Sequence, residues 1–175
     1  MKVKDVMTSE KLQYCSTETK LHNAAKVMKK ANCGALPVLD SSRKVIGIVT
    51  DRDICLTLAD RQIKPHAELN VGDIVSQKLY SVRTEDDLAQ ALSKMRTYKV
   101  GRLPVTDQSG TLQGMLTIHD LLSKSLNGQP DLGKFTATGE NVAKTIKALA
   151  DRYSNATALK QSATDHSVGR ENWEE

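Results

Sequence analysis

Apolar residues recur near the start of the chain with the spacing of a helix. Four of them have the 3.6-residue period of a buried helical stripe: Leu21, Ala24, Ala25 and Met28. Thr17 precedes this run, where a helix N-cap is expected. Gly34 follows it, and glycine is frequent just after the last turn of a helix. The pattern therefore predicts an amphipathic helix that begins at Thr17 and ends before Gly34.

Short apolar runs bounded by turn residues come next. ALPVLD, at residues 35–40, is typical of a strand that starts at a proline, where the missing N–H costs least. VIGIVT, at residues 45–50, follows a turn of Ser, Arg and Lys, so the two runs suit a strand hairpin. A short segment around Tyr14 precedes the helix, and a second helix is expected to begin at Thr50. This part of the chain is predicted to be strand, helix, strand, strand, helix.

The same order of elements repeats after 67 residues. Residues 17–53 laid over residues 84–120 without gaps give 14 identities in 37 positions. Further upstream, KVKDVMT matches NVGDIVS. A duplicated small domain of class α+β follows. Because one small sheet cannot bury both of its faces, the two repeats are expected to pack on each other about a pseudo-twofold axis.

The chain divides into five predicted segments. They are a first domain at 1–68, a second domain at 69–126, a linker at 127–139, a C-terminal helix at 140–153 and a polar, mobile tail at 154–175. Four apolar residues share one face of the C-terminal helix: Val142, Ile146, Leu149 and Tyr153. This helix either packs on its own module, or exchanges with a second protomer or docks on a client protein.

Composition narrows the function classes. Three cysteines without a CxxC pair argue against a disulfide framework or a zinc site, and no apolar run reaches the length of a membrane span, so we expect a cytoplasmic protein. The first 127 residues carry a net charge of +5. That surplus suits a phosphate-bearing small molecule. A nucleic-acid partner is disfavoured because aromatic side chains are few and no Lys/Arg run is present.

The most informative repeated stretch is GIVTDRD at residues 47–53 and GMLTIHD at residues 114–120. A threonine followed three residues later by an acidic residue resembles a helix capping box, which needs no ligand. Both copies nevertheless carry Asp, whose side chain is shorter than that of the usual Glu or Gln. The glycine lets another group approach the strand end, a carboxylate can accept from ribose hydroxyls, and a helix N-terminus can accept phosphate. The pattern therefore allows a cap, a nucleotide site, or both.

This motif, behind an LPV-D strand and repeated once, resembles the cystathionine-beta-synthase (CBS) domain pair over about residues 1–125. The resemblance implies a tandem module that binds adenosine-containing ligands in clefts between the repeats. It assigns a ribose role to the threonine and aspartate, adenine contact to the strand residue after the glycine, and phosphate contact to the residue before the aspartate. The implied ligand-binding residues are Thr50, Asp53, Ile48 and Arg52 in the first copy and Thr117, Asp120, Met115 and His119 in the second. Many family members have a proline shortly after the first strand, and this chain has none there.

The leading hypothesis is a regulatory sensor that binds AMP, ADP, ATP or S-adenosylmethionine and alters its contact with a client protein. No nucleophile with an adjacent base is visible and the histidines lack metal-ligand spacing, so we expect no enzyme, no catalytic residue and no required cofactor. A homodimer is expected because twofold dimers are the commonest closed assembly. The alternatives are a structural dimerisation module without a ligand and, less favoured, a nucleic-acid-binding module.

Overall fold

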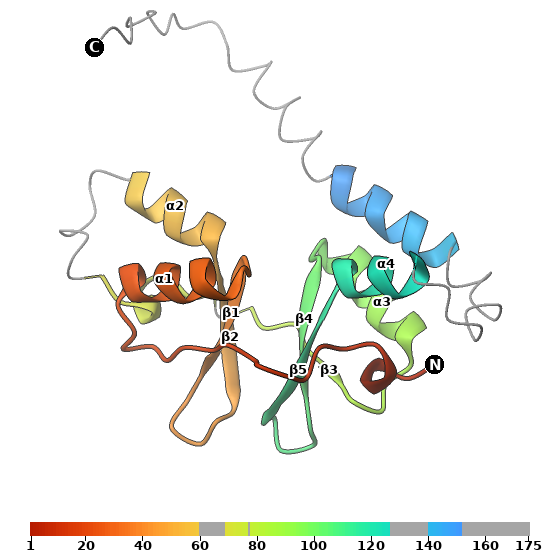
Figure 1. Ribbon diagram of the computed structural model, residues 1–175, viewed down its shortest axis with the longest axis horizontal. Coiled ribbons are helices and arrows are strands. Elements are labelled where there is room, and N and C mark those ends of the chain that lie inside the picture. Colours follow the sequence, from red (N-terminus) through yellow and green to blue (C-terminus); the bar gives the residue numbers. More distant parts are fainter. Residues whose placement is uncertain (60–68, 77, 127–139, 152–175) are drawn as a thin grey trace, which may run out of the picture.

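The computed structural model describes residues 1–59, 69–76, 78–126 and 140–151, and the predicted linker at 127–139 and tail at 154–175 lie outside them. Figure 1 shows two similar units side by side, each with helices above a small sheet and a strand hairpin below. The prediction of an α+β fold with two repeats is confirmed.

Each unit is built from a hairpin and two helices. The first contains α1 (Leu21–Ala31), β1 (Ala35–Leu39), β2 (Val45–Thr50) and α2 (Asp51–Ala59). The second contains β3 (Val82–Arg83), α3 (Leu88–Tyr98), β4 (Arg102–Thr106), β5 (Leu112–Thr117) and α4 (Ile118–Leu126). Two short 3-10 helices, η1 (Val3–Asp5) and η3 (Val71–Asp73), and a helix at 140–151 complete the described chain.

The two hairpins have matching registers. β1 runs antiparallel to β2 with Pro37 opposite Ile48, and β4 runs antiparallel to β5 with Pro104 opposite Met115. The strand predicted before the first helix differs between the units. In the second unit β3 runs parallel to β4, whereas in the first unit the equivalent pairing is a single parallel bridge between Cys15 and Val38.

The predicted start of the first helix in each unit is wrong. α1 and α3 begin four residues after Thr17 and Thr84, and neither N-cap residue makes a side-chain capping bond. The residues before each helix form a turn instead. In the second unit Asp86 closes this turn, because its Oδ2 accepts from Arg83 N at 2.9 Å.

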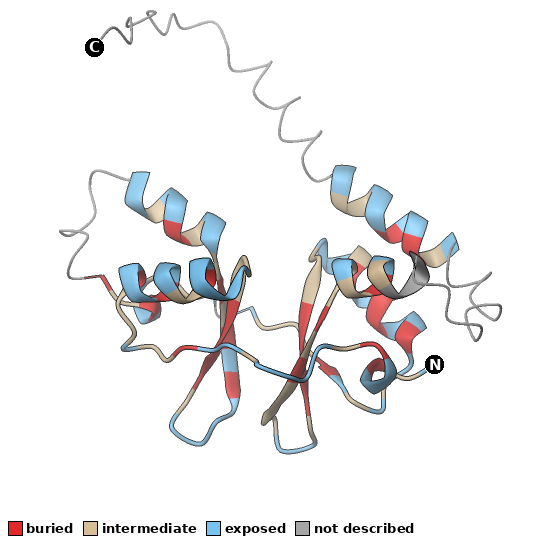
Figure 2. Cartoon of the chain, in the orientation of Figure 1, coloured by how far each residue is buried: buried red, intermediate tan, exposed pale blue. Residues whose placement is uncertain are grey.

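Each unit has an aliphatic core, and each core contains buried residues from a segment outside its own run of helices and strands (Figure 2). Val3, near the N-terminus, is fully buried in the core of the second unit, and Val71 is fully buried in the core of the first. The first helical N–H groups repeat this exchange, because Leu88 N donates to Met1 O and Leu21 N donates to Leu69 O, both at 3.1 Å. Each unit is therefore completed by a segment that precedes the other unit in sequence.

An ion pair also joins the N-terminal segment to the second unit. Lys2 Nζ lies 3.0 Å from Asp87 Oδ1, and this contact lowers the pKa of Asp87 from its ordinary value. Both side chains are exposed, so the pair contributes little stability beside the buried valines. The N-terminal segment is therefore held by its buried valines and by backbone hydrogen bonds, such as that from Val3 N to Asp86 O at 3.0 Å, more than by this ion pair.

The helix at 140–151 packs on the second unit. Val142 is buried in that unit's core, and Thr145 is fully buried. Arg96 Nη1 on α3 donates to Thr145 Oγ1 and to Asn141 O, both at 3.3 Å. Among the helices of the described residues, none is both long enough and apolar enough to cross a membrane.

Candidate functional site

The threonine and aspartate of each repeated motif close a capping box at the start of a helix. In the second copy Asp120 Oδ2 accepts from Thr117 N at 2.8 Å and from Thr117 Oγ1 at 2.7 Å, while Asp120 N donates back to Thr117 Oγ1 at 3.1 Å. The corresponding distances for Thr50 and Asp53 are 2.9, 2.7 and 3.1 Å. The shorter aspartate is thus long enough for the cap, which uses only one of its two oxygens.

The second oxygen of Asp120 faces the N-terminal segment. Asp120 Oδ1 accepts from Thr8 Oγ1 at 3.0 Å, and Thr8 and Met115 exchange two backbone hydrogen bonds of 2.9 Å. This approach requires Gly114, since a Cβ there would lie 2.8 Å from both Thr8 O and Met7 Sδ. The repeated glycine therefore admits a neighbouring chain segment to the strand end.

The first copy has the same approach but a different polar environment. A Cβ on Gly47 would lie 2.4 Å from Val75 Cγ2 and 3.2 Å from Ser76 O. Ser76 thus takes the place of Thr8, yet its hydroxyl accepts from Lys78 N at 3.2 Å. Within the described residues no side chain donates a hydrogen bond to Asp53 Oδ1.

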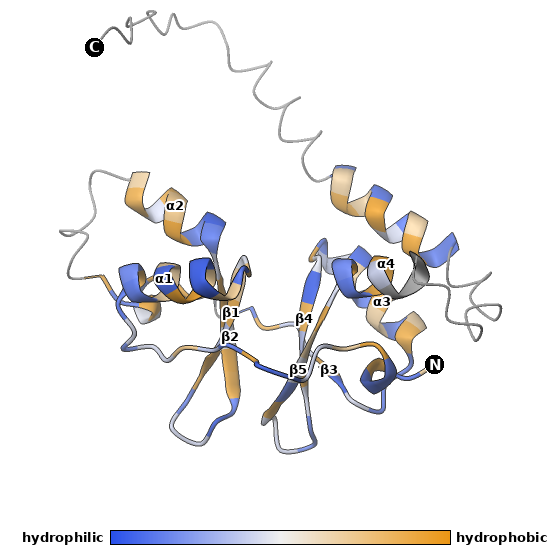
Figure 3. Cartoon of the chain, in the orientation of Figure 1, coloured by the Kyte–Doolittle hydropathy of each residue, from blue (hydrophilic) through white to orange (hydrophobic). Residues whose placement is uncertain are grey.

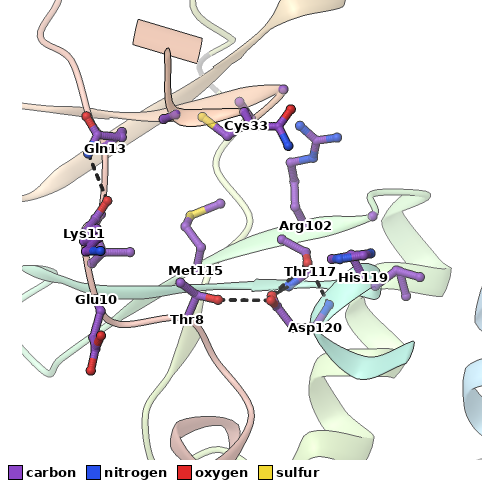
Figure 4. A pocket seen from close by; sticks show the side chains of 17 residues that line it. Thr8, Glu10, Lys11, Gln13, Cys33, Arg102, Met115, Thr117, His119 and Asp120 are labelled. Carbon is purple, nitrogen blue, oxygen red and sulfur yellow. Dashed lines mark hydrogen bonds between the residues drawn. The ribbon is translucent and has the colours of Figure 1, made fainter. Parts of the chain in front are cut away.

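A cleft of about 670 Å³ opens beside the second copy (Figure 4). Its walls come from four segments of the chain: residues 8–13, the end of α1 with the start of β1, the start of β4, and the junction of β5 with α4. All four residues predicted in the second motif line it: Met115, Thr117, His119 and Asp120. The cleft therefore lies between the repeats, as a site formed by both.

Three basic side chains, Lys11, Arg102 and His119, line this cleft together with the acidic Glu10 and Asp120. Figure 4 shows Arg102 reaching from β4 toward Cys33, on the opposite wall, with His119 beside Thr117. A Cβ on Gly34 would lie 3.3 Å from Arg102 Nη1, so the guanidinium spans the gap between the repeats. His119 Nε2 lies 3.3 Å from Ser123 Oγ, and Lys11 lines the other wall. These groups suit an anionic end of a ligand.

The residues predicted in the first motif do not line this cleft. Ile48 is opposite Pro37 in the hairpin, Thr50 and Asp53 form the cap, and Arg52 is exposed on α2. The motif alone also misses Thr8 and Cys33 on the far wall of the second cleft. The match between KVKDVMT and NVGDIVS is the signal that points to Thr8, because it places Thr8 and Ser76 at equivalent positions.

The two copies also differ in aromatic neighbours. Tyr80 and Tyr98 stack with their ring centroids 3.9 Å apart. By the 67-residue repeat their counterparts are Gln13 and Ala31, which line the second cleft. The two positions that are small or polar in the wall of the second cleft, Gln13 and Ala31, are thus a stacked pair of tyrosines in the other repeat.

Comparison with known proteins identifies the family. The model of the CBS domain matches residues 3–60 and 71–127. The chain belongs to the CBS domain family. Its relatives include the YlbB protein of Bacillus subtilis (strain 168), which is 38% identical over 128 residues covering 72% of this chain and 84% of YlbB. Inosine-5'-monophosphate dehydrogenase of Aquifex aeolicus (strain VF5) is 28% identical over 77% of this chain, which spans only 28% of that enzyme.

Solved structures of CBS domain pairs have the same fold. The CBS domain pair of protein MJ0100, in complex with 5'-methylthioadenosine and S-adenosyl-L-methionine, superposes with a TM-score of 0.65 at 23% identity, covering 74% of this chain and 98% of that one. CBSX2 in complex with AMP gives a TM-score of 0.63 at 27% identity, with 72% and 96% covered. CBSX2 from Arabidopsis thaliana, in a second structure, gives a TM-score of 0.61 at 25% identity, with 72% and 94% covered.

Proposed function

We propose that this CBS domain pair is a regulatory module that binds an adenosine nucleotide in the cleft beside Asp120. The observation that carries the proposal is the position of the Asp120 carboxylate. One oxygen is fixed by Thr117 and the other, Oδ1, is presented to the cleft, where it is bonded to the hydroxyl of Thr8. A ribose hydroxyl can replace a threonine hydroxyl at such an oxygen without loss of hydrogen bonding.

The remaining lining fits the other two parts of a nucleotide. Met115 offers a polarisable apolar side chain for adenine, and the apolar Ala35 also lines the cleft. Arg102, His119 and the N-terminus of α4 supply positive charge for phosphate. AMP in the CBSX2 structure, at 27% identity, supports this ligand class.

The first motif is proposed as a second and weaker nucleotide site, with Thr50 and Asp53 on ribose, Ile48 beside adenine and Arg52 near phosphate. Its capping box matches the box of the second motif. Among the described residues both side-chain bonds of Asp53 with Thr50 use Oδ2, which leaves Oδ1 available to a ligand. S-adenosylmethionine, ADP and ATP remain candidates at either site.

Residues 8–13 can couple ligand binding in the cleft to the rest of the module. Thr8 is bonded to Asp120 and Met115 of the second unit, while Cys15 N, a few residues later, donates to Pro37 O of the first. A ligand that displaces Thr8 shifts this connecting segment, and can regulate only as far as it binds the two arrangements unequally. We infer a cytoplasmic homodimer whose contact with a client protein changes in this way.

Thermal unfolding with a ligand panel tests the proposal. The panel contains AMP, ADP, ATP, S-adenosylmethionine, GMP as the base control and a short oligonucleotide as the nucleic-acid control. A ligand at 100 times its dissociation constant is expected to stabilise the fold by about 2.7 kcal/mol. Stabilisation by adenosine ligands but not by GMP or the oligonucleotide supports the proposal. No stabilisation by any adenosine ligand contradicts it.

A further inference from the structure

A stacked pair of tyrosines lies in the second repeat where the first repeat has no rings. The centroids of Tyr80 and Tyr98 are 3.9 Å apart, and the two ring planes are inclined by 12°. Tyr80 precedes β3, and Tyr98 is the last residue of α3. The stack therefore joins the segment before β3 to the end of α3, and the equivalent residues of the first repeat are Gln13 and Ala31.

The segment that leads to Tyr80 approaches the first motif in the same way as the N-terminal segment approaches the second. A Cβ on Gly47 would lie 3.2 Å from Ser76 O, and a Cβ on Gly114 would lie 2.8 Å from Thr8 O. Each segment thus passes over the glycine of a motif before it reaches the first helix of its own repeat. The two segments therefore follow equivalent courses, one beside each motif.

The pairing of the residues that follow fixes the equivalence of Tyr80 and Gln13. Two positions after Tyr80, Val82 pairs with Val105 of β4, and two positions after Gln13, Cys15 bridges the residue of β1 that is equivalent to Val105. The 67-residue shift between the repeats thus holds in the strand pairing as well as in the sequence. Because Gln13 lines the second cleft, Tyr80 is expected at the corresponding place beside the first motif.

The strand side of the two motifs is alike, so the rings are a main difference between them. Figure 3 shows apolar residues along β2 and along β5, the strands that carry the motifs. Ile48 and Met115 have the same register, since each lies opposite the proline of its hairpin. The residue proposed to contact adenine is therefore apolar in both copies, and the wall that faces it is not.

The stack as it stands leaves no space for a base between its rings. Their faces are in contact at 3.9 Å, and Tyr80 also packs against the core of the second unit. Tyr98 is 45% exposed, so it can be displaced without disturbing that core. A base that enters beside Ile48 must therefore open the aromatic pair, which lowers its affinity.

We propose that the Tyr80–Tyr98 stack occupies the space for the base at the first motif and so determines which motif binds a nucleotide more tightly. The inference rests on the proposed function, and it supplies the cause of the weaker first site. At the second motif the same two positions are Gln13 and Ala31, which line the open cleft of about 670 Å³. The chain therefore carries one preformed nucleotide site and one that its own side chains close.

Calorimetry with AMP on full chains that carry Asp120→Ala tests the inference, because this background leaves only the first motif intact. Adding Tyr98→Ala is expected to tighten AMP binding about threefold to tenfold, since the ligand no longer has to open an aromatic pair. Adding Tyr98→Phe keeps the ring and should leave the affinity of the background unchanged. Tyr14→Ala is the matched control, because Tyr14 is 46% exposed but its ring lies against Arg43.

The reciprocal change is made in Asp53→Ala, where only the second motif is intact. Gln13→Tyr together with Ala31→Tyr is expected to weaken AMP binding about tenfold, because two rings then fill space that the base occupies. Thermal unfolding before each titration shows that the variants are folded. Unchanged affinity in this folded variant would show that rings at these positions do not reach the base, and would overturn the inference.

The outcomes in the Asp120→Ala background are equally decisive. Tighter binding with Tyr98→Ala, and no change with Tyr98→Phe or Tyr14→Ala, supports the inference. Weaker or unchanged binding with Tyr98→Ala, or an equal gain with Tyr98→Phe, would overturn it. AMP binding by Asp53→Ala is the readout of the proposed function. If this binding persists while Tyr98→Ala has no effect, only the present inference fails, whereas loss of all AMP binding overturns both.

Discussion

The two copies of the motif have almost the same internal geometry and different surroundings. Each threonine and aspartate closes a capping box with distances that agree within 0.1 Å. Asp120 then meets the hydroxyl of Thr8 at a lined cleft, while Ser76, in the place of Thr8, is bonded elsewhere. The local sequence thus forms the same cap in both copies. The neighbouring segments determine whether the Oδ1 oxygen of each aspartate receives a side-chain hydrogen bond.

The helical faces of the two units diverge in a similar way. The second carries buried Leu92 under the helix at 140–151, and the first carries exposed Ala25 at the equivalent position. The two repeats therefore differ in that the helical face of the second is covered by another helix, while the equivalent position in the first is exposed. Both differences can be tested by changing one copy and using the other as its control.

The largest effect is expected from Asp120→Ala. Loss of a charge-assisted hydrogen bond to ribose costs about 1.5–3 kcal/mol, which is roughly a tenfold to hundredfold rise in the dissociation constant for AMP. The same variant loses a cap worth only about 1 kcal/mol of stability. Calorimetry on folded Asp120→Ala and Asp53→Ala measures both effects. We expect weaker binding in each and the larger loss in Asp120→Ala. Unchanged affinity in both variants would leave the motif as a cap alone.

Gly114→Ala is expected to lower the free energy of unfolding by about 1–3 kcal/mol, the usual cost of overpacking a close contact. The added Cβ meets the backbone oxygen of Thr8 at 2.8 Å, so the N-terminal segment must move. Gly47→Ala is the matched variant of the first copy, where the added Cβ would lie 2.4 Å from Val75 Cγ2 and 3.2 Å from the backbone oxygen of Ser76, so a loss of stability is expected there too. Urea unfolding compares the two. We expect AMP affinity to rise in Gly114→Ala, because a displaced Thr8 hydroxyl competes less with ribose for Asp120. Equal affinity in both variants would separate Thr8 from the binding site.

Thr8→Val is expected to tighten AMP binding by about threefold to tenfold, because a net hydrogen bond of about 0.5–1.5 kcal/mol no longer competes with ribose for Asp120. Valine keeps the shape of threonine, so the two backbone bonds to Met115 should persist. Ser76→Ala, at the equivalent position, should leave affinity nearly unchanged. Weaker binding in Thr8→Val would show that the hydroxyl holds the ligand rather than competing with it.

The smallest effect concerns phosphate. In Asp53→Ala, which leaves only the second motif intact, ATP binding is expected to weaken a few-fold on His119→Ala, because the imidazole lines the cleft beside Thr117 and a ring N–H can donate to phosphate. Adenosine, which has no phosphate, should bind equally with and without His119. Equal ATP affinity with and without His119 would transfer the phosphate role to Arg102 or to the N-terminus of α4.

The elements of each unit could be read from the sequence because they depend on neighbours in the chain. The apolar period of Leu21 to Met28 gives α1, and the runs around Pro37 and Gly47 give the hairpin. The start of α1 could not be read from Thr17. Its N-cap position depends on a bond from Leu21 N to Leu69 O, an atom distant in sequence.

The sequence by itself determined the duplication, the α+β repeat and the two capped motifs, because each rests on residue types within a few positions of one another. Only the tertiary structure decided that Val3 completes the second unit and Val71 the first. It also placed Thr8 on Asp120 and Arg102 near Gly34. These contacts join residues that no local pattern links, and they form because each small sheet gains buried apolar surface by borrowing a segment that precedes the other.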